Sequence, residues 1–329
     1  MSAPMSFDPR VWTAHAHAKV NLHLGVAEPR EDGFHELATV FQSLSIHDVV
    51  TLEEVGGPTG ASSSASRVLS LEVDGPYALG VPADSSNLAW RAVDLVASRL
   101  REKFGPRDLP QVALYLTKGI PAAGGMAGGS ADCAAALRLA DRCFSQYYTM
   151  DTLGEDELMG LAAQLGSDVP FTLMGGTALG TGRGEQLTPM ISRGSYAWAF
   201  ISSHEGLSTP AVFAKLDELR AAGRGVGPSM DTTAVGQALM SGKAQRLAGA
   251  LANDLQAAAV SLRPDLRKTL KAGKAAGALC GIVSGSGPTC AFLCEDEGIA
   301  ADVVSQVTVE IPKTRGFVAT GPAAGAVLV

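Results

Sequence analysis

The chain has 329 residues, 46% of them hydrophobic and 18% charged, with a formal net charge of −7 at neutral pH. This length and apolar content favour two domains or one large domain, and 38 glycines are typical of an enzyme with glycine-rich loops rather than a coiled coil or a disordered chain. No run of Lys and Arg stands out, so we expect no nucleic-acid partner.

The N-terminal half shows mainly strand patterns, with helical patterns between them. Residues 1–10 are expected to be a loose tail, and the small residues at 56–66 predict an exposed loop. Asn87 follows two serines and predicts a helix N-cap. In chain order we expect strands at 12–26, 49–55, 68–73 and 112–116, an apolar segment at 35–46, helices at 88–96, 131–144 and 155–165, and a strand-like segment at 169–179.

The C-terminal half is expected to be richer in helices. Pro210 suits the first turn of a helix, and small residues at 221–229 predict a connector. The pattern predicts an α+β fold with two lobes that divide near residue 190, giving domains 1–190 and 191–329. The expected elements are strands at 196–202 and within 281–293, helices at 209–221 and near 299–307, helical material over 232–276, and a closing strand.

Neither a membrane segment nor a disulfide framework is expected. The N-terminus lacks the basic and apolar regions of a secretory signal, and no stretch approaches the roughly 18 apolar residues of a membrane helix. The five cysteines contain no C-x-x-C pair, which favours buried thiols in a reducing compartment over a metal site. We therefore expect a soluble, cytoplasmic protein without metal-ligating residues.

The most informative segment is the glycine-rich stretch 118–132, KGIPAAGGMAGGSAD. Glycines let the backbone approach an anion and turn successive N–H groups toward it. A helix that begins directly behind the loop adds the positive end of its dipole. Strand, glycine loop and helix in this order predict a cradle for phosphate groups, although such a loop taken alone also suits a tight structural turn.

Three common nucleotide-binding motifs do not fit this segment. A Walker loop ends in Gly-Lys followed by Ser or Thr, whereas residues 128–130 read Gly-Gly-Ser. A dinucleotide fingerprint has another glycine spacing within a parallel βαβ unit. A protein kinase carries His-Arg-Asp and Asp-Phe-Gly, and neither is present.

The string PAAGGMAGGSADCAAAL resembles the second signature motif of the GHMP kinases, the family of galactokinase, homoserine kinase and mevalonate kinase. Residues 18–22 (AKVNL) and 284–292 (SGSGPTCAF) resemble its first and third motifs, in the family's order. The resemblance implies a ribosomal-protein-S5-like N-terminal lobe, a ferredoxin-like C-terminal lobe and an active site in the cleft between them.

The resemblance also implies ATP and Mg²⁺, with a phosphate-binding loop in which Met126 and Ala127 replace the more usual Leu-Gly. The third-motif loop, made by Ser284, Gly285, Ser286 and Gly287, would close over the phosphates. The residues implied in ATP binding are Asn87, Lys118, Pro121, Gly124, Gly125, Met126, Ala127, Gly128, Gly129 and Ser130.

Within the family, residues 18–48 and the segment 165–170 (LGSDVP) are similar to the subfamily that phosphorylates a cytidine diphosphate conjugate of methylerythritol. That subfamily uses ATP to convert the 2-hydroxyl to the 2-phosphate, in the non-mevalonate route to isoprenoid precursors. The resemblance makes Asp168 the base that accepts the hydroxyl proton and Lys19 its charge partner. Lys19 and Asn21 are two residues apart, so on a strand they project to one face.

For the cytidine end, the resemblance implies a base stacked between two aromatic rings. The matching residues are Phe34, where a tyrosine is more usual, and Phe213. His35 would recognise the edge of the pyrimidine. The substrate-binding set implied in this way is Asn21, Phe34, His35, Thr209 and Phe213.

Two other functions stay open at this stage. The first is another GHMP kinase, acting on homoserine, mevalonate or a sugar; the aromatic positions argue against it. The second is a non-catalytic sensor of the same fold, which would have no need to keep both Lys19 and Asp168. We expect a small-molecule substrate, no membrane partner, and a monomer or a homodimer.

Overall fold

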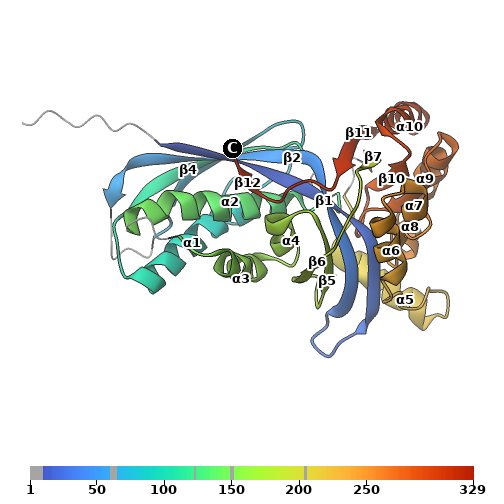
Figure 1. The fold of residues 1–329 in the computed structure, drawn as a ribbon, viewed down its shortest axis with the longest axis horizontal. Coiled ribbons are helices and arrows are strands. Elements are labelled where there is room, and N and C mark those ends of the chain that lie inside the picture. Colours follow the sequence, from blue (N-terminus) through green and yellow to red (C-terminus); the bar gives the residue numbers. More distant parts are fainter. Residues whose placement is uncertain (1–9, 60–64, 122–123, 149–151, 204–205) are drawn as a thin grey trace, which may run out of the picture.

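The computed structural model describes residues 10–59, 65–121, 124–148, 152–203 and 206–329. It has two lobes, each built on its own sheet, as the sequence predicts (Figure 1). The larger sheet has eight strands in the order β12-β1-β2-β4-β3, extended by β5 and β6 beside β2 and by β8 beside β1. The smaller has four, in the order β11-β7-β10-β9.

The strands are β1 (Val11–Pro29), β2 (His35–Thr59), β3 (Val68–Asp74), β4 (Leu109–Thr117), β5 (Thr177–Thr181), β6 (Gln186–Pro189), β7 (Tyr196–Ser203), β8 (Ala252–Asn253), β9 (Cys280–Val283), β10 (Cys290–Cys294), β11 (Thr314–Gly321) and β12 (Val327–Leu328). The helices are α1 (Leu88–Phe104), α2 (Gly128–Ser145), α3 (Glu155–Leu165), α4 (Val169–Met174), α5 (Thr209–Ala221), α6 (Thr233–Ser241), α7 (Ala244–Ala248), α8 (Gln256–Leu262), α9 (Asp265–Ala275) and α10 (Glu297–Glu310), with a short 3₁₀ turn at Gln146–Tyr148.

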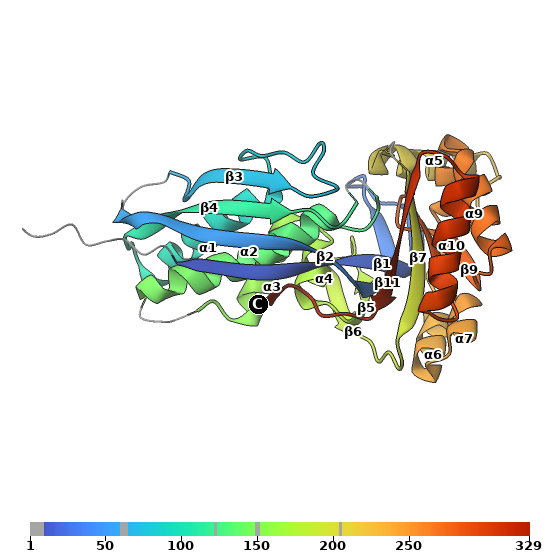
Figure 2. The same ribbon diagram turned by 90° about the horizontal axis from the view of Figure 1, so that it is seen from above.

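One face of the larger sheet is covered by helices (Figures 1 and 2). On β1, Ala14, Ala16 and Ala18 are fully buried toward this layer. The alanine-rich α2 packs against both β1 and β2, because small side chains allow a helix to approach a sheet closely. The glycine loop at the start of α2 is thereby fixed to the rigid centre of the first lobe.

The β1–β2 hairpin belongs to both lobes. Its distal residues Leu24 and Val26 are buried in the core of the second lobe, together with residues of α5 and α8. Arg220 and Asp254 of the second lobe bond the hairpin: the guanidinium donates to the Val26 carbonyl at 2.8 Å, and the carboxylate accepts from its amide at 2.8 Å. The middle of β1, which carries Lys19 and Asn21, therefore lies between the lobes.

The prediction of a strand-like segment at 169–179 is wrong for the first half of that segment. Residues 169–174 form α4, and β5 begins only at Thr177. Residues 169–173 are all buried, so the apolar run shows no periodicity that separates a helix from a strand. Pro170 lies in the first turn of α4, where a backbone N–H would have no acceptor within the helix, so the missing N–H of proline costs no hydrogen bond.

Smaller differences concern the ends of elements. The two segments expected at 35–46 and 49–55 form one continuous strand, β2, which extends to Thr59 into the predicted loop. The remainder of that loop at 60–64 and the tail at 1–9 lie outside the described residues. The predicted division at residue 190 falls between β6, in the first sheet, and β7, in the second. As a domain boundary it stays a prediction, since β12 returns to the first sheet.

Among the described residues, no helix is long and apolar enough to cross a membrane. All five cysteines are free thiols, and four of them are buried, as the sequence predicts.

Candidate active site

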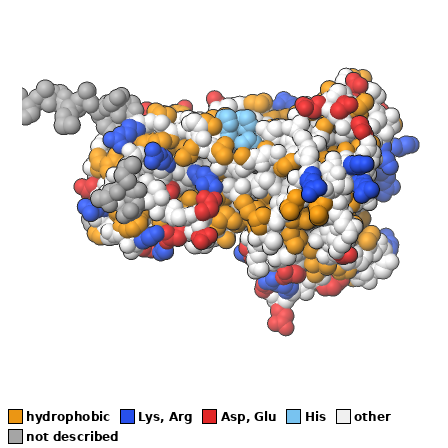
Figure 3. All heavy atoms as spheres, in the orientation of Figure 1, with side chains coloured by type: hydrophobic (Ala, Val, Ile, Leu, Met, Phe, Trp, Pro, Cys, Tyr) orange, Lys and Arg blue, Asp and Glu red, His pale blue; other side chains and the backbone are white. Residues whose placement is uncertain are grey.

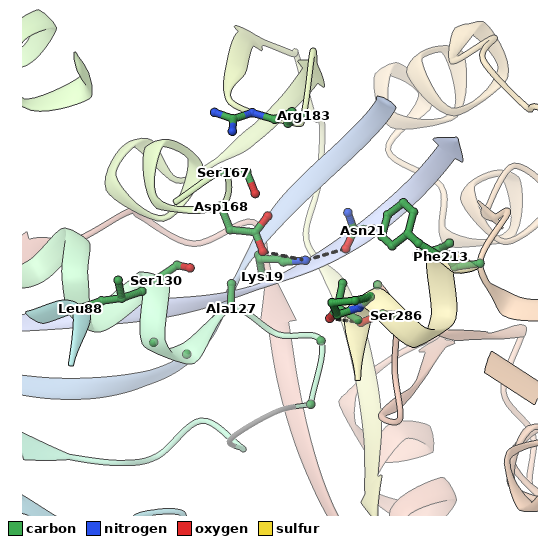
Figure 4. A pocket seen from close by; sticks show the side chains of 18 of the residues that line it. Lys19, Asn21, Leu88, Ala127, Ser130, Ser167, Asp168, Arg183, Phe213 and Ser286 are labelled. Carbon is green, nitrogen blue, oxygen red and sulfur yellow. Dashed lines mark hydrogen bonds and ion pairs between the residues drawn. The ribbon is translucent and has the colours of Figure 1, made fainter. Parts of the chain in front are cut away.

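A cavity of about 1120 Å³ lies between the two lobes (Figure 4). It is lined by residues of β1 and β2, the segment 80–88, the glycine loop with the start of α2, residues 167–168 just before α4, α5 and the third-motif loop. Most of the predicted site residues line it: Lys19, Asn21, Phe34, His35, Asn87, Lys118, Pro121, Gly124, Gly125, Ala127, Gly128, Gly129, Ser130, Asp168, Thr209, Phe213, Gly285 and Ser286. Three do not line it: Met126, Ser284 and Gly287.

Lys19 and Asp168 form an ion pair in the wall of the cavity, with 3.6 Å between Nζ and Oδ2. The Lys19 side chain is 5% exposed and that of Asp168 is 34% exposed, so the carboxylate is the partner open to a ligand. Figure 4 shows the Lys19 ammonium between Asp168 and Asn21, whose Oδ1 accepts from Nζ at 2.8 Å. Asn21 is itself held by Thr39, which accepts from its amide at 2.8 Å. Sequence reasoning missed this supporting threonine, because it lies on another strand.

The glycine loop touches the third-motif loop through backbone atoms. A Cβ on Gly125, whose φ is +74°, would lie 2.1 Å from the carbonyl oxygen of Ser284, so only glycine fits there. The Ser284 hydroxyl donates to the Gly125 carbonyl at 3.1 Å. Ser284 therefore acts behind the cavity wall, where it fixes one glycine loop against the other.

The helix behind the loop begins at Gly128, three residues before the predicted start, so Ser130 is in its first turn. The N-terminal end of a helix carries unpaired N–H groups and a positive partial charge. Because Gly128, Gly129 and Ser130 all line the cavity, this end of α2 faces the space where an anion would bind. Met126 is fully buried, and its carbonyl accepts from the Lys19 amide at 3.2 Å.

Ala127 has the backbone conformation that explains why glycine is common at its position. Its φ of 59° and ψ of 32° are left-handed. A left-handed conformation costs a residue with a Cβ about 1–2 kcal/mol. Replacing it by glycine removes this cost, but the unfolded chain gains conformational freedom, which cancels about 0.4–1 kcal/mol of the gain in stability.

We expect Ala127→Gly to raise the free energy of unfolding by about 0.5–1 kcal/mol, because the strain is released. Denaturant unfolding with an unchanged m-value measures this. The matched change Ala301→Gly, at an exposed position inside α10, is expected to lower stability by about 1 kcal/mol. A loss of stability in Ala127→Gly equal to that of the control would contradict the strain.

Lys118 lies beneath the loop in a buried ion cluster with Asp48 and Asp132, both of which contact its ammonium group. Asp48 also accepts from the amides of Gly119 and Ile120, at 2.6 and 2.7 Å. Asp132 is in α2, so the cluster ties the strand before the loop to the helix after it. Sequence reasoning placed Lys118 near the adenosine; the structure places its ammonium group between two carboxylates, with 2% of the side chain exposed.

Burial and charge pairing act in opposite directions on the pKa values in this cluster. Burial raises the pKa of Asp132 to about 8, against the opposing attraction of Lys118. Burial alone would lower the pKa of Lys118, but the Asp132 and Asp48 carboxylates raise it above its usual value. Burial thus favours the protonated form of Asp132, whereas the neighbouring carboxylates favour the charged form of Lys118.

The far end of the cavity carries the aromatic residues. Phe213 on α5 packs against the His35 ring with 5.1 Å between centroids, and Phe34 is 52% exposed beneath the Arg183 guanidinium at 5.4 Å. His35 Nε2 is 2.9 Å from Oδ1 of Asp217. Sequence reasoning missed Arg183 and Asp217 as site residues, although Asp217 lies one helical turn after Phe213 and so shares its face.

Two of the predicted binding residues, which line the cavity, also make hydrogen bonds that hold the fold together. Asn87 caps α1, where its Oδ1 accepts from the Ala89 amide at 2.9 Å and its amide group donates to the Pro82 carbonyl at 2.7 Å. Thr209, the first residue of α5, is 2.8 Å from the Ser286 hydroxyl, so α5 is tied to the third-motif loop.

Comparisons with known proteins agree with this arrangement. The models for the GHMP kinases N-terminal domain and C-terminal domain match residues 87–176 and 233–310. A 4-diphosphocytidyl-2-C-methyl-D-erythritol kinase from Corynebacterium diphtheriae is 51% identical over 95% of this chain and 96% of its own length. A crystal structure of 4-(cytidine 5'-diphospho)-2C-methyl-D-erythritol kinase superposes with a TM-score of 0.71 and 29% identity, over 96% of this chain and all of that one. A homoserine kinase from Cytophaga hutchinsonii shares the fold, with a TM-score of 0.69 and 17% identity over the whole of both chains.

Proposed function

Because the chain belongs to the GHMP kinase family, we propose that it transfers the γ-phosphoryl group of ATP to the 2-hydroxyl of 4-diphosphocytidyl-2-C-methyl-D-erythritol. The products are the 2-phosphate and ADP, in the methylerythritol phosphate route to isoprenoid precursors. The chain is an ATP-dependent small-molecule kinase. The observation that carries it is the Lys19–Asp168 pair in a cavity that also holds the glycine loop and the aromatic residues.

Phosphoryl transfer leaves the protein mainly positioning and charge neutralisation to perform. The glycine loop and the N-terminal end of α2 would hold the phosphates of ATP through backbone N–H groups. The attacking hydroxyl oxygen forms a bond to the γ-phosphorus while the bond to the β,γ-bridging oxygen breaks. Asp168 accepts the hydroxyl proton, and Lys19 stabilises the carboxylate before that transfer.

Mg²⁺ bound to the phosphates would neutralise the charge that develops on them. The described residues contain no group of three His, Cys, Asp or Glu side chains suited to a metal ion. Mg²⁺ commonly takes most of its ligands from water and phosphate oxygens, with only one or two from the protein. The Ser130 hydroxyl in the first turn of α2 fits that limited role.

The cytidine base fits the end of the cavity that carries Phe34, His35 and Phe213. A carboxylate only accepts hydrogen bonds, so His35 donates to Asp217 through Nε2–H. In the neutral ring the other nitrogen, Nδ1, is then an acceptor, which suits the amino group of a cytosine. Asp217 thus sets which side of His35 donates and which accepts.

The test of the proposed function is a panel of alcohols. Purified protein is mixed with Mg-ATP, and ADP release is followed with 4-diphosphocytidyl-2-C-methyl-D-erythritol, homoserine, mevalonate and galactose. Turnover with the cytidine compound alone supports the proposal. Turnover with another alcohol would keep the ATP site and discard the cytidine site, and ATP binding without any turnover would favour a sensor.

Phe213→Ala is expected to raise the KM for the cytidine substrate about 5–150-fold, because a base–aromatic stack contributes about 1–3 kcal/mol. The kcat and the KM for ATP should change little, since the ring packs against His35 and not against the glycine loop. Steady-state kinetics with each substrate varied measures the difference. Phe104→Ala removes a part-buried ring outside the cavity and is the control. Equal effects on both KM values would contradict the stacking role.

A further inference from the structure

Between β11 and β12 the chain leaves the second sheet and crosses to the first (dark red in Figure 1). We call residues 322–326 the C-terminal strap. Its first anchor is Ser43 on β2, whose hydroxyl accepts from the Ala323 amide at 3.0 Å and donates to the Ala323 carbonyl. The same carbonyl accepts from the Gly176 amide at 2.9 Å. The strap is therefore fixed both to β2 and to the turn after α4.

Two successive backbone hydrogen bonds connect the strap to Asp168 through Thr172. The Ala326 amide donates to the Thr172 carbonyl at 2.9 Å, and the Thr172 amide donates to the Asp168 carbonyl at 3.1 Å. The Thr172 hydroxyl is also 3.0 Å from the Ser130 carbonyl, at the start of α2. Since α4 has only six residues, these contacts set the position of its first turn, where Asp168 is the N-cap residue.

The crossing of the strap over α4 leaves no room for side chains. A Cβ on Gly325 would lie 2.2 Å from the Leu173 carbonyl oxygen, and a Cβ on Gly175 would lie 2.0 Å from the Gly325 nitrogen. Backbone-to-backbone contact of this kind has little freedom to shift. A methyl group at position 325 must therefore move α4, the strap or both.

The other side of the strap is bound to β1, the strand of Lys19. The His17 ring donates through Nδ1 to the Gly325 carbonyl at 2.9 Å, and β12 pairs with β1 directly beyond the strap. The His17 ring lies 5.2 Å from that of His47, on which His15 stacks at 4.1 Å between ring centroids. Figure 3 shows a patch of histidine side chains on the surface of this face. The strap thus connects the strand that carries Lys19 to the helix that Asp168 begins.

We propose that the C-terminal strap is a positioning element for Asp168, which holds α4 against β1 so that the carboxylate stays 3.6 Å from the Lys19 ammonium. This inference rests on the proposed function, in which that pair accepts the hydroxyl proton. Gly325 and Ser43 are its positioning residues; neither lines the cavity.

Gly325→Ala is expected to lower kcat about 10²-fold, because a displacement of about 1 Å of a catalytic group is enough for such a loss. The KM for ATP should change less than kcat, because Gly325 itself contacts α4 and His17 and not the glycine loop. Gly160→Ala, at a position in α3 with nothing within 4 Å of the added carbon, is the matched control. A kcat for Gly325→Ala equal to that of the control would overturn the proposal.

Ser43→Ala is a milder variant that decides the question if Gly325→Ala does not fold. Its control is Ser45→Ala on the same strand, whose hydroxyl accepts from Thr320 before the strap begins. A lower kcat at unchanged KM for ATP in Ser43→Ala but not in Ser45→Ala supports the strap. Equal kinetics in the two variants would count against it.

Hydrogen–deuterium exchange of the amides of residues 168–176 measures whether the strap holds α4, and it does not depend on turnover. Faster exchange in Ser43→Ala than in Ser45→Ala is expected, and equal exchange overturns the proposal. If the wild-type chain released no ADP with any alcohol of the panel, the proposed function would fail, whereas the exchange result would still show whether the strap holds α4.

Discussion

Asp168→Asn is expected to lower kcat for the cytidine substrate about 10²–10⁴-fold, the usual contribution of a positioned general base. The amide keeps the size of the carboxylate but cannot accept the hydroxyl proton. The KM values should change little, because the loss is confined to the transition state. Steady-state ADP release, with substrate and ATP each varied, is the measurement.

The control for Asp168→Asn is the same chemical change at Asp302, an exposed residue of α10 outside the cavity. Its kinetics should match the wild type. Lys19→Met should also lower kcat, and the double variant should lose less than the product of the two single losses, because the pair acts as a unit. A kcat for Asp168→Asn within a factor of about three of the wild type would contradict the role of Asp168 as the general base.

Lys118→Met is expected to destabilise the fold by about 3–5 kcal/mol, the usual consequence of removing one partner from a buried ion pair. The change leaves the Asp48 carboxylate buried, with only the amides of Gly119 and Ile120 to compensate its charge. The midpoint of urea unfolding measures the loss, and ATP affinity should fall as well, because the two ends of the glycine loop are no longer tied together.

Two further variants test this explanation. Lys271→Met removes an exposed lysine of α9 and should stay within about 0.5 kcal/mol of the wild type. Lys118→Met combined with Asp48→Asn removes the charged groups of Lys118 and Asp48 and keeps an acceptor for the two amides. It should recover about 1–3 kcal/mol relative to Lys118→Met alone. No recovery would mean that packing, and not charge, explains the loss.

The sequence by itself determined the features that depend on neighbouring residues. Alternation by two places Lys19 and Asn21 on one face of β1, where their side chains are in fact hydrogen-bonded. Helical spacing and Pro210 predicted α5 with both ends correct, and the glycine run before an alanine-rich helix predicted the loop and α2. These patterns are local because backbone geometry repeats within a few residues.

Only the tertiary structure decided which distant groups meet. Lys118 lines the cavity beside the glycine loop, and the tertiary structure also pairs it with Asp48, which lies 70 residues away. Likewise His35 meets Asp217 at a separation of 182 residues, and Ser43 meets Ala323 at 280. The sequence could not show that residues 169–174 form a helix and not a strand, because burial on all sides removed the periodicity that distinguishes the two. Such contacts depend on how sheets and helices pack, and no local spacing encodes that packing.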